Sequence, residues 1–216
     1  MHTNKILIYV DSMHPAGGIE RVVSKHIYFF SKKYNVMLLR KDSLESFYEL
    51  PQNITIESLQ ISDKYNMHCK LQRIYQTLKQ LFVVRKKLED YKNEYDLVYC
   101  THVRNLLELY LSGFNLKKVI LTEHGSYYGY NKVYKILKRF LYPKCKYIIS
   151  PTSMDYNIYK LQKCNAIYIA NPLSFYHERF ADLTSKTIVN IGRLTSDKRQ
   201  DLLLKIWNIV SKNYPD

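Results

Sequence analysis

The sequence predicts an α/β fold, in which helices cover both faces of a doubly wound parallel sheet. Short, continuous apolar runs such as Lys5–Val10 recur along the chain, and such runs are typical of strands buried on both faces. Between them lie longer segments whose apolar residues recur at helical spacing. Strands that alternate with helices in this way favour parallel strands joined by right-handed crossovers.

The strands are expected in a regular series. The first, Lys5–Val10, is stopped by Asp11, and the loop 11–18 follows it. Further apolar runs predict strands at 35–39, 54–59, 96–101, 118–122, 147–150, 166–170 and, after a gap, 187–191.

The helices are expected between these strands. In the first, Ile19, Val22 and Ile27 share one face, while charged residues lie off it. The region 64–93 has helical spacing and is strongly basic. The remaining helices are expected at 105–111, 131–142, 154–161 and 202–210.

A domain boundary is expected near the end of the series. We place a first domain at 1–172, a linker without clear periodicity at 173–186, and the start of a second domain at 187–216. In that last part, a predicted strand stops at Gly192, and a cationic loop and an amphipathic run follow, which is the layout of a phosphate-binding unit. One strand and one helix cannot bury their own apolar faces. We therefore expect this piece either to dock on the first domain or to leave Trp207 unusually exposed.

The amino-acid composition indicates a soluble globular protein with an unusual positive charge. The 216 residues allow one or two domains, and 46% apolar and 24% charged residues are ordinary for a soluble globular protein. A net charge of +14 and 21 tyrosines are not ordinary. They favour an anionic partner such as nucleic acid, lipid headgroups or a nucleotide sugar. Codon usage in an AT-rich genome explains the same composition, and no helix-turn-helix, zinc-finger or RNA-binding motif supports nucleic acid.

The spacing of the cysteines and the length of the apolar runs indicate where in the cell the protein is found. The four cysteines form no C-x-x-C pair, so we expect reduced thiols and no zinc site. No run is long enough for a signal peptide or a membrane helix. We expect a cytoplasmic protein whose membrane contact, if it has any, is peripheral on the inner face of the cell membrane.

Gly17 and Gly18 lie between the first strand and the first helix. Small residues let a ligand approach the backbone, and a helix N-terminus offers free N–H groups to an anion. The pair is not part of a G-x-G-x-x-G fingerprint. Plain turn geometry is the competing interpretation.

His124 follows a predicted buried strand and precedes Gly125. A neutral imidazole there could bond a sugar hydroxyl or a developing charge, or it could merely cap the strand. His14, His102 and Glu123 occupy comparable loop positions and are weaker candidates. His26 falls on the apolar side of its helix and is expected to be a satisfied core histidine.

Arg193 and Lys198 lie around a turn after Gly192. Two cations beside a helix N-terminus suit a diphosphate, and the arginine fork can bind two of its oxygens. An ordinary solvated basic loop is the alternative.

Two basic faces, at 64–92 and 132–146, are the remaining candidates. A basic amphipathic helix with aromatic residues can lie on anionic lipid, or it can simply be solvated. The second face lacks acidic residues, and its cations are Lys132, Lys135, Lys138, Arg139, Lys144 and Lys146.

These residues together resemble the retaining glycosyltransferases of family 4, which have the two-domain GT-B fold. The resemblance covers the whole chain but only about the first half of such an enzyme. Four stretches in the family's order carry it: Gly17–Val23, Thr122–Gly125, Asn171–Pro172 and Ile191–Leu204.

The resemblance implies a Rossmann-like acceptor domain followed by the beginning of a nucleotide-sugar domain. It implies that Gly17 and Gly18 approach the donor phosphates, that His124 contacts the transferred sugar, and that Arg193 and Lys198 bind the diphosphate. Transfer in the family retains the anomeric configuration and needs no metal or other cofactor. Many relatives use glycan or lipid-linked acceptors near membranes, which agrees with the basic surface.

We therefore expect a hexosyl-type glycosyltransferase in surface polysaccharide or glycolipid synthesis, with a nucleotide sugar as donor and no nucleic-acid partner. The family's acidic donor-binding pair has no counterpart before Asp216, so this chain alone is expected to be inactive. The rival hypothesis is a non-catalytic basic module that binds a membrane surface or nucleic acid.

Overall fold

A computed structural model describes residues 4–61, 70–173, 178, 184 and 187–214. The first part of the predicted helix 64–93, most of the predicted linker 173–186, and Cys69 lie outside these residues. The chain divides into two compact units, Met1–Pro172 and Leu173–Asp216, which are described separately.

The first unit is built on a seven-stranded sheet in which every neighbouring pair of strands is parallel. The strand order is β3-β2-β1-β4-β5-β6-β7. The strands are β1 (Lys5–Val10), β2 (Asn35–Arg40), β3 (Thr55–Ser58), β4 (Leu97–Cys100), β5 (Val119–Thr122), β6 (Tyr147–Ser150) and β7 (Ala166–Tyr168). The predicted α/β class and doubly wound parallel sheet are confirmed.

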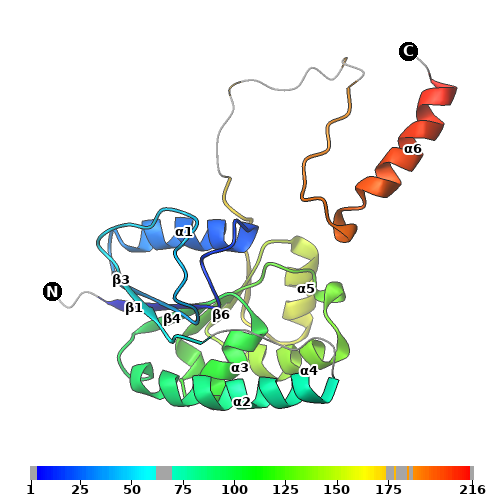
Figure 1. Cartoon of the computed structure of the whole chain (residues 1–216). Coiled ribbons are helices and arrows are strands. Elements are labelled where there is room, and N and C mark those ends of the chain that lie inside the picture. Colours follow the sequence, from blue (N-terminus) through cyan, green and yellow to red (C-terminus); the bar gives the residue numbers. More distant parts are fainter. Residues whose placement is uncertain (1–3, 62–69, 174–177, 179–183, 185–186, 215–216) are drawn as a thin grey trace. The chain divides into compact units, whose positions relative to one another are not determined.

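Helices cover the two faces of this sheet unequally. Helix α1 (Gly18–Phe30) lies on one face, while α2, α3 and α4 lie on the other (Figure 1). The helices on that second side are α2 (Lys70–Leu88), α3 (Val103–Leu111), α4 (Lys132–Leu141) and α5 (Ser153–Leu161), and their buried residues share one cluster.

The core follows from the apolar runs of the sequence. On β1, Leu7 and Tyr9 face the cluster shared with α2 to α5, while Ile6, Ile8 and Val10 face the cluster shared with α1. Because successive strand residues point to opposite faces, a strand covered on both sides must be apolar throughout. The expected boundaries are close to the observed ones for this reason.

The second unit departs from expectation. It holds a 3₁₀ turn (Ser196–Lys198) and α6 (Gln200–Asn213), but residues 187–191 form no strand. The predicted strand there is wrong. A strand needs a neighbour to complete its backbone hydrogen bonds, and none of the described residues pairs with this run. Its apolar side chains are exposed, with Ile191 at 94%.

Candidate active site

The carboxyl ends of β1 and β4 form the natural ligand position of this sheet. These strands are neighbours, yet the chain leaves β1 toward β2 and leaves β4 toward β5, on opposite sides. Ligands of open α/β sheets bind in the crevice at such a switch point. The loop after β1, the start of α3 and the residues after β5 converge on this edge, which we call the carboxyl edge.

Gly17 and Gly18 stand at the start of α1, as predicted. Gly17 is the N-cap in an extended conformation, and a Cβ added there would collide with the Glu20 carboxylate. A Cβ added at Gly18 would meet nothing within 4 Å. A side chain at Gly17 would displace the flexible Glu20 carboxylate, whereas Gly18 leaves open space at a helix N-terminus, where N–H groups and the helix dipole favour an anion.

His124 lies just beyond the end of β5. Its Nε2 atom is buried and has no hydrogen-bond partner among the described residues. Burial, helped by the nearby His26 of α1, lowers the pKa of His124 to about 4. The imidazole is therefore neutral at pH 7 and retains a ring nitrogen that a ligand hydroxyl can engage.

His26 has a structural partner. Its Nδ1 atom lies 3.0 Å from the Tyr99 hydroxyl, and the two rings meet edge to face. This agrees with the expectation of a satisfied core histidine.

Glu123 is buried inside the unit, although it is adjacent to His124. Its Oε1 atom lies 2.8 Å from Nζ of Lys138, and it accepts hydrogen bonds from the hydroxyls of Tyr130 and Tyr142. Glu123 and Lys138 are 1% and 0% exposed. Glu123 thus organises the core beneath the carboxyl edge.

Lys138 therefore does not belong to the basic surface predicted at 132–146, and that part of the prediction is wrong. In α4, Lys138 follows Tyr134 by four residues and precedes Leu141 by three, so all three lie on the inward face. Its ammonium group also lies 3.2 Å from the centroid of the Tyr130 ring. The helical spacing from two inward-facing neighbours is the sequence signal that identifies it.

A second charge network, in which Lys41 and Glu108 are buried, lies under the loop after β1. Nζ of Lys41 is 2.6 Å from Asp11 and 2.7 Å from Glu108, and Tyr9 donates to Glu108 across 2.7 Å. Burial alone would raise the pKa of Asp11, but Lys41 and Asn105 hold it below its ordinary value. Burial raises the pKa of Glu108, and Lys41 only partly opposes this.

This network is not among the sites predicted from the sequence. Lys41 follows an apolar strand directly, and Glu108 shares the helical spacing of the inward residues Asn105 and Leu109. A lysine and a glutamate in two such positions are a detectable signal, but their pairing depends on the fold.

His102 lies between the two networks as the N-cap of α3. Its Nδ1 atom accepts a hydrogen bond from the backbone N–H of Arg104 across 3.1 Å, which assigns the ring proton to Nε2. Burial lowers the pKa of His102, against the charges of Asp11 and Glu123. The weaker candidate is thus a helix cap whose ring contacts Tyr130 and Tyr134.

Arg193 and Lys198 belong to the second unit, and both are exposed. The Arg193 carbonyl accepts hydrogen bonds from the Gln200 side chain and the Thr195 N–H, each across 2.9 Å, so the loop folds back on itself. Arg199, the N-cap of α6, has a left-handed backbone with φ of 53°.

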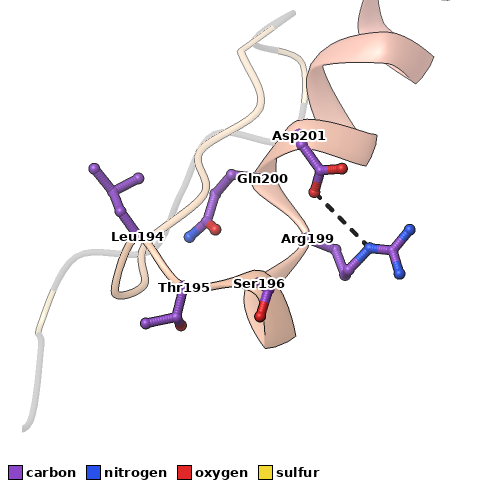
Figure 2. Close-up of a pocket in the computed structure, with 6 residues that line it drawn as sticks. All are labelled: Leu194, Thr195, Ser196, Arg199, Gln200 and Asp201. Carbon is purple, nitrogen blue, oxygen red and sulfur yellow. Dashed lines mark ion pairs between the residues drawn. The ribbon is translucent and has the colours of Figure 1, made fainter.

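A pocket of about 480 Å³ is formed by this loop and the start of α6 (Figure 2). Arg199 and Asp201 line it and face each other, 3.8 Å apart. Neither predicted cation is among its lining residues, which are Leu194, Thr195, Ser196, Arg199, Gln200 and Asp201. The diphosphate role of Arg193 and Lys198 stays a prediction.

Comparison with known proteins gives sequence relatives of one kind, although no protein-family model matches the chain. An uncharacterized glycosyltransferase of Haemophilus influenzae is 27% identical over 98% of this chain and 60% of its own length. An α-1,4-N-acetyl-D-galactosaminyltransferase of Campylobacter jejuni, named for a diphospho-undecaprenol-linked glycan, is 24% identical over 92% of this chain and 55% of its own. The amylovoran biosynthesis glycosyltransferase AmsD of Erwinia amylovora is 25% identical over 96% and 59%.

All three relatives are named glycosyltransferases, and one of them is named for amylovoran biosynthesis. The chain spans between 55% and 60% of the length of these three proteins.

Solved structures confirm the Rossmann-like half of a GT-B fold. Sucrose-phosphate synthase from Thermosynechococcus elongatus superposes with a TM-score of 0.57 at 13% identity, covering 77% of this chain and 48% of that one. UDP-N-acetylglucosamine 2-epimerase from Rickettsia bellii superposes with a TM-score of 0.55 at 12% identity, covering 79% and 45%. Because a synthase and an epimerase share this fold, the fold alone does not decide the reaction.

Proposed function

We propose that this protein is a retaining glycosyltransferase of family 4. It transfers a hexosyl-type sugar from a nucleotide-diphosphate donor to a glycan or lipid-linked acceptor, without a metal or other cofactor. The observation that carries the proposal is the similarity of nearly the whole chain to three proteins that are all named glycosyltransferases. The undecaprenol-linked glycan in one of those names supports the acceptor class.

In this proposal, donor binding is electrostatic. The donor phosphates approach Gly18 at the N-terminus of α1, where an added Cβ would meet nothing within 4 Å. Arg193 and Lys198, which belong to the second unit, are the cations that bind the diphosphate. Positive groups aimed at a leaving diphosphate stabilise the charge that develops as the glycosidic bond breaks.

His124 engages a hydroxyl of the transferred sugar through Nε2. Support comes from its buried, unpartnered ring nitrogen and from the low pKa that keeps the imidazole neutral. A neutral imidazole orients the sugar without placing a positive charge beside an oxocarbenium-like centre.

The pairing of three carboxylates, the buried Glu108 and Glu123 and the partly exposed Asp11, supports retention over inversion. Inversion uses a base that removes the acceptor proton as the acceptor attacks. Asp11, Glu108 and Glu123 each form an ion pair with a buried lysine, so none of these three is a free base.

An anionic membrane surface is a further partner in the proposal. Among the helices that the structure describes, none combines the length and hydropathy needed to cross a membrane. A lipid-linked acceptor would then be reached from the membrane surface, and the basic outer face of α4 supports such contact.

The test is a screen of nucleotide-diphosphate sugars with the full-length protein and a polyprenyl-diphosphate-linked glycan. We expect one donor to give a product whose anomeric configuration, determined by NMR, matches that of the donor. His124→Ala should lower kcat about 100-fold with the fold intact, because one transition-state hydrogen bond is lost. Arg193→Ala should reduce turnover much more than acceptor binding.

Two results would overturn the proposal. One is an absence of transfer from every donor together with salt-sensitive DNA binding, which is the behaviour of a basic binding module. The other is an inverted product, which would reject the retaining family.

A further inference from the structure

Helix α4 is apolar on its outer side as well as its inner side. Val133, Ile136 and Phe140 are 66%, 69% and 53% exposed, and their spacing places them in one ridge. The inner side is closed by Leu141 and the buried Lys138. An ordinary surface helix buries its one apolar stripe, so the ridge needs a partner of its own.

The ridge is flanked only by cations. Exposed Lys132, Arg139 and Lys144 lie beside or beyond it, and the sequence from Lys132 to Lys146 contains no Asp or Glu. An apolar stripe bordered by lysine and arginine matches the boundary between acyl chains and anionic headgroups.

A pocket of about 620 Å³ opens at the C-terminal end of this ridge, between the ends of α3 and α4. The Tyr110 and Phe140 rings meet edge to face, and Nζ of Lys144 lies 3.2 Å from the centroid of the Phe140 ring. Ridge and pocket are therefore continuous. The lining includes two lysines and no acidic residue: Tyr110, Phe114, Asn115, Leu116, Lys117, Pro143, Lys144 and Cys145.

Helix α2 repeats the outer ridge on the same side of the sheet. Tyr75, Leu78 and Phe82 are 67%, 61% and 69% exposed at the same spacing. Helices α2 and α4 both pack against α3, and all three cover one face (Figure 1). The apolar and basic outer surface therefore extends across several helices.

We propose that this surface docks on an anionic lipid membrane. The α4 ridge inserts among the acyl chains, and the α3–α4 pocket, through Lys117 and Lys144, holds a phosphate-bearing lipid headgroup. A membrane offers acyl chains to the apolar ridge and anionic headgroups to the lysines beside it. A free anion would bind the lysines but would leave the apolar ridge exposed. The inference deepens the membrane partner of the proposed function.

The test is cosedimentation of the chain with vesicles of phosphatidylcholine and phosphatidylglycerol, compared with pure phosphatidylcholine, at moderate salt. We expect binding only to the anionic vesicles. Phe140→Ser should weaken it several-fold, and Lys117→Gln with Lys144→Gln roughly ten-fold or more, since each lysine near a charged surface contributes measurably. Circular dichroism checks that each variant is folded.

Matched controls lie on α1 and just after its end, on the other face of the sheet. Phe29 is 60% exposed, and Lys25 and Lys32 are exposed. Phe29→Ser, and Lys25→Gln with Lys32→Gln, make the same chemical changes and should leave vesicle binding unaltered. Equal losses of vesicle binding in the α1 and α4 variants would show that binding does not depend on the α4 surface. That result would overturn the inference.

A second copy of the chain is the rival occupant of this surface. A concentration-dependent dimer that Phe140→Ser abolishes, in a protein that ignores anionic vesicles, would overturn the membrane assignment. The vesicle assay contains no nucleotide sugar, so its failure is distinct from failure of the proposed transfer. Transfer to a water-soluble acceptor should be unchanged in Phe140→Ser.

Discussion

Glu123 and His124 are neighbours in sequence but have different functions at the end of β5. Glu123 is enclosed by Lys138 and two tyrosine hydroxyls, whereas His124 keeps an unpartnered nitrogen. A buried charge is tolerated when it is paired and hydrogen-bonded. The carboxylate therefore fixes the geometry from which the imidazole projects.

Lys138→Met tests this structural role. The substitution leaves the buried Glu123 carboxylate without its ammonium partner, and breaking such a pair costs about 3–5 kcal/mol in free energy of unfolding. Urea unfolding followed by circular dichroism measures it. Adding Glu123→Gln to Lys138→Met should recover much of the loss, because no charge is then stranded.

Lys132→Met is the matched control, since Lys132 is exposed on the same helix. Its effect should stay within about 0.5 kcal/mol. Equal losses for Lys132→Met and Lys138→Met would contradict the buried pair.

His124 gives stability a pH dependence of known sign. Burial lowers the pKa of His124 in the folded protein to about 4, below the ordinary histidine value of 6.5, so the unfolded chain binds the proton first as pH falls. The free energy of unfolding should therefore fall from pH 7.5 to pH 5, by on the order of 1–2 kcal/mol for this residue.

The pH dependence of the free energy of unfolding is compared between the wild type and His124→Gln. The difference isolates the contribution of His124, because all other titratable groups are present in both proteins. The variant should lose less stability between pH 7.5 and pH 5. His14→Gln, which removes an imidazole from an exposed loop position, is the matched substitution. Parallel curves for wild type and His124→Gln would contradict the buried neutral imidazole.

At the scale of elements, the sequence predicts well where burial is two-sided. Strands β1 and β5 are continuous apolar runs because helices cover both of their faces, so their composition alone reveals them. The run 187–191 has the same composition but forms no strand, because strand formation also requires a neighbour. Local composition therefore identifies a segment that can form a strand. Whether the segment forms one depends on a neighbouring strand that completes its backbone hydrogen bonds.

Candidate site residues follow the same logic. The positions of Gly17, Gly18 and His124 were predictable because they lie in the loops after β1 and β5, where parallel sheets place their ligands, although their binding roles stay predictions. The pairing of Lys41 with Glu108 was not, because it joins positions 67 residues apart. Long-range pairing of this kind appears only once the strand order is known.

The cap of α3 is an element-scale prediction. His102→Ala removes the acceptor of the Arg104 N–H, whereas His102→Asn retains a side-chain acceptor. Both variants lose the ring contacts with Tyr130 and Tyr134. The difference between their free energies of unfolding therefore measures the contribution of the capping hydrogen bond. His102→Asn should be about 1 kcal/mol more stable than His102→Ala in urea unfolding, and equal stabilities would show that the cap contributes nothing.

At the scale of the whole molecule, the two units differ in how they are stabilised. The first has a sheet with core clusters on both faces, while α6 of the second has no buried residue. An isolated helix of this length is marginal in water, because most helical stability comes from packing. We therefore expect the two units to unfold independently.

Trp207 makes this testable, because it is the single tryptophan of the chain and lies on α6, 41% exposed. Its fluorescence reports the second unit alone, while circular dichroism is dominated by the first. We expect acrylamide to quench Trp207 nearly as well as free N-acetyltryptophanamide. Low urea should alter its emission before the circular dichroism transition begins. A blue-shifted emission, protected from acrylamide and lost together with the dichroism signal, would show instead that α6 is packed and that the two units unfold as one.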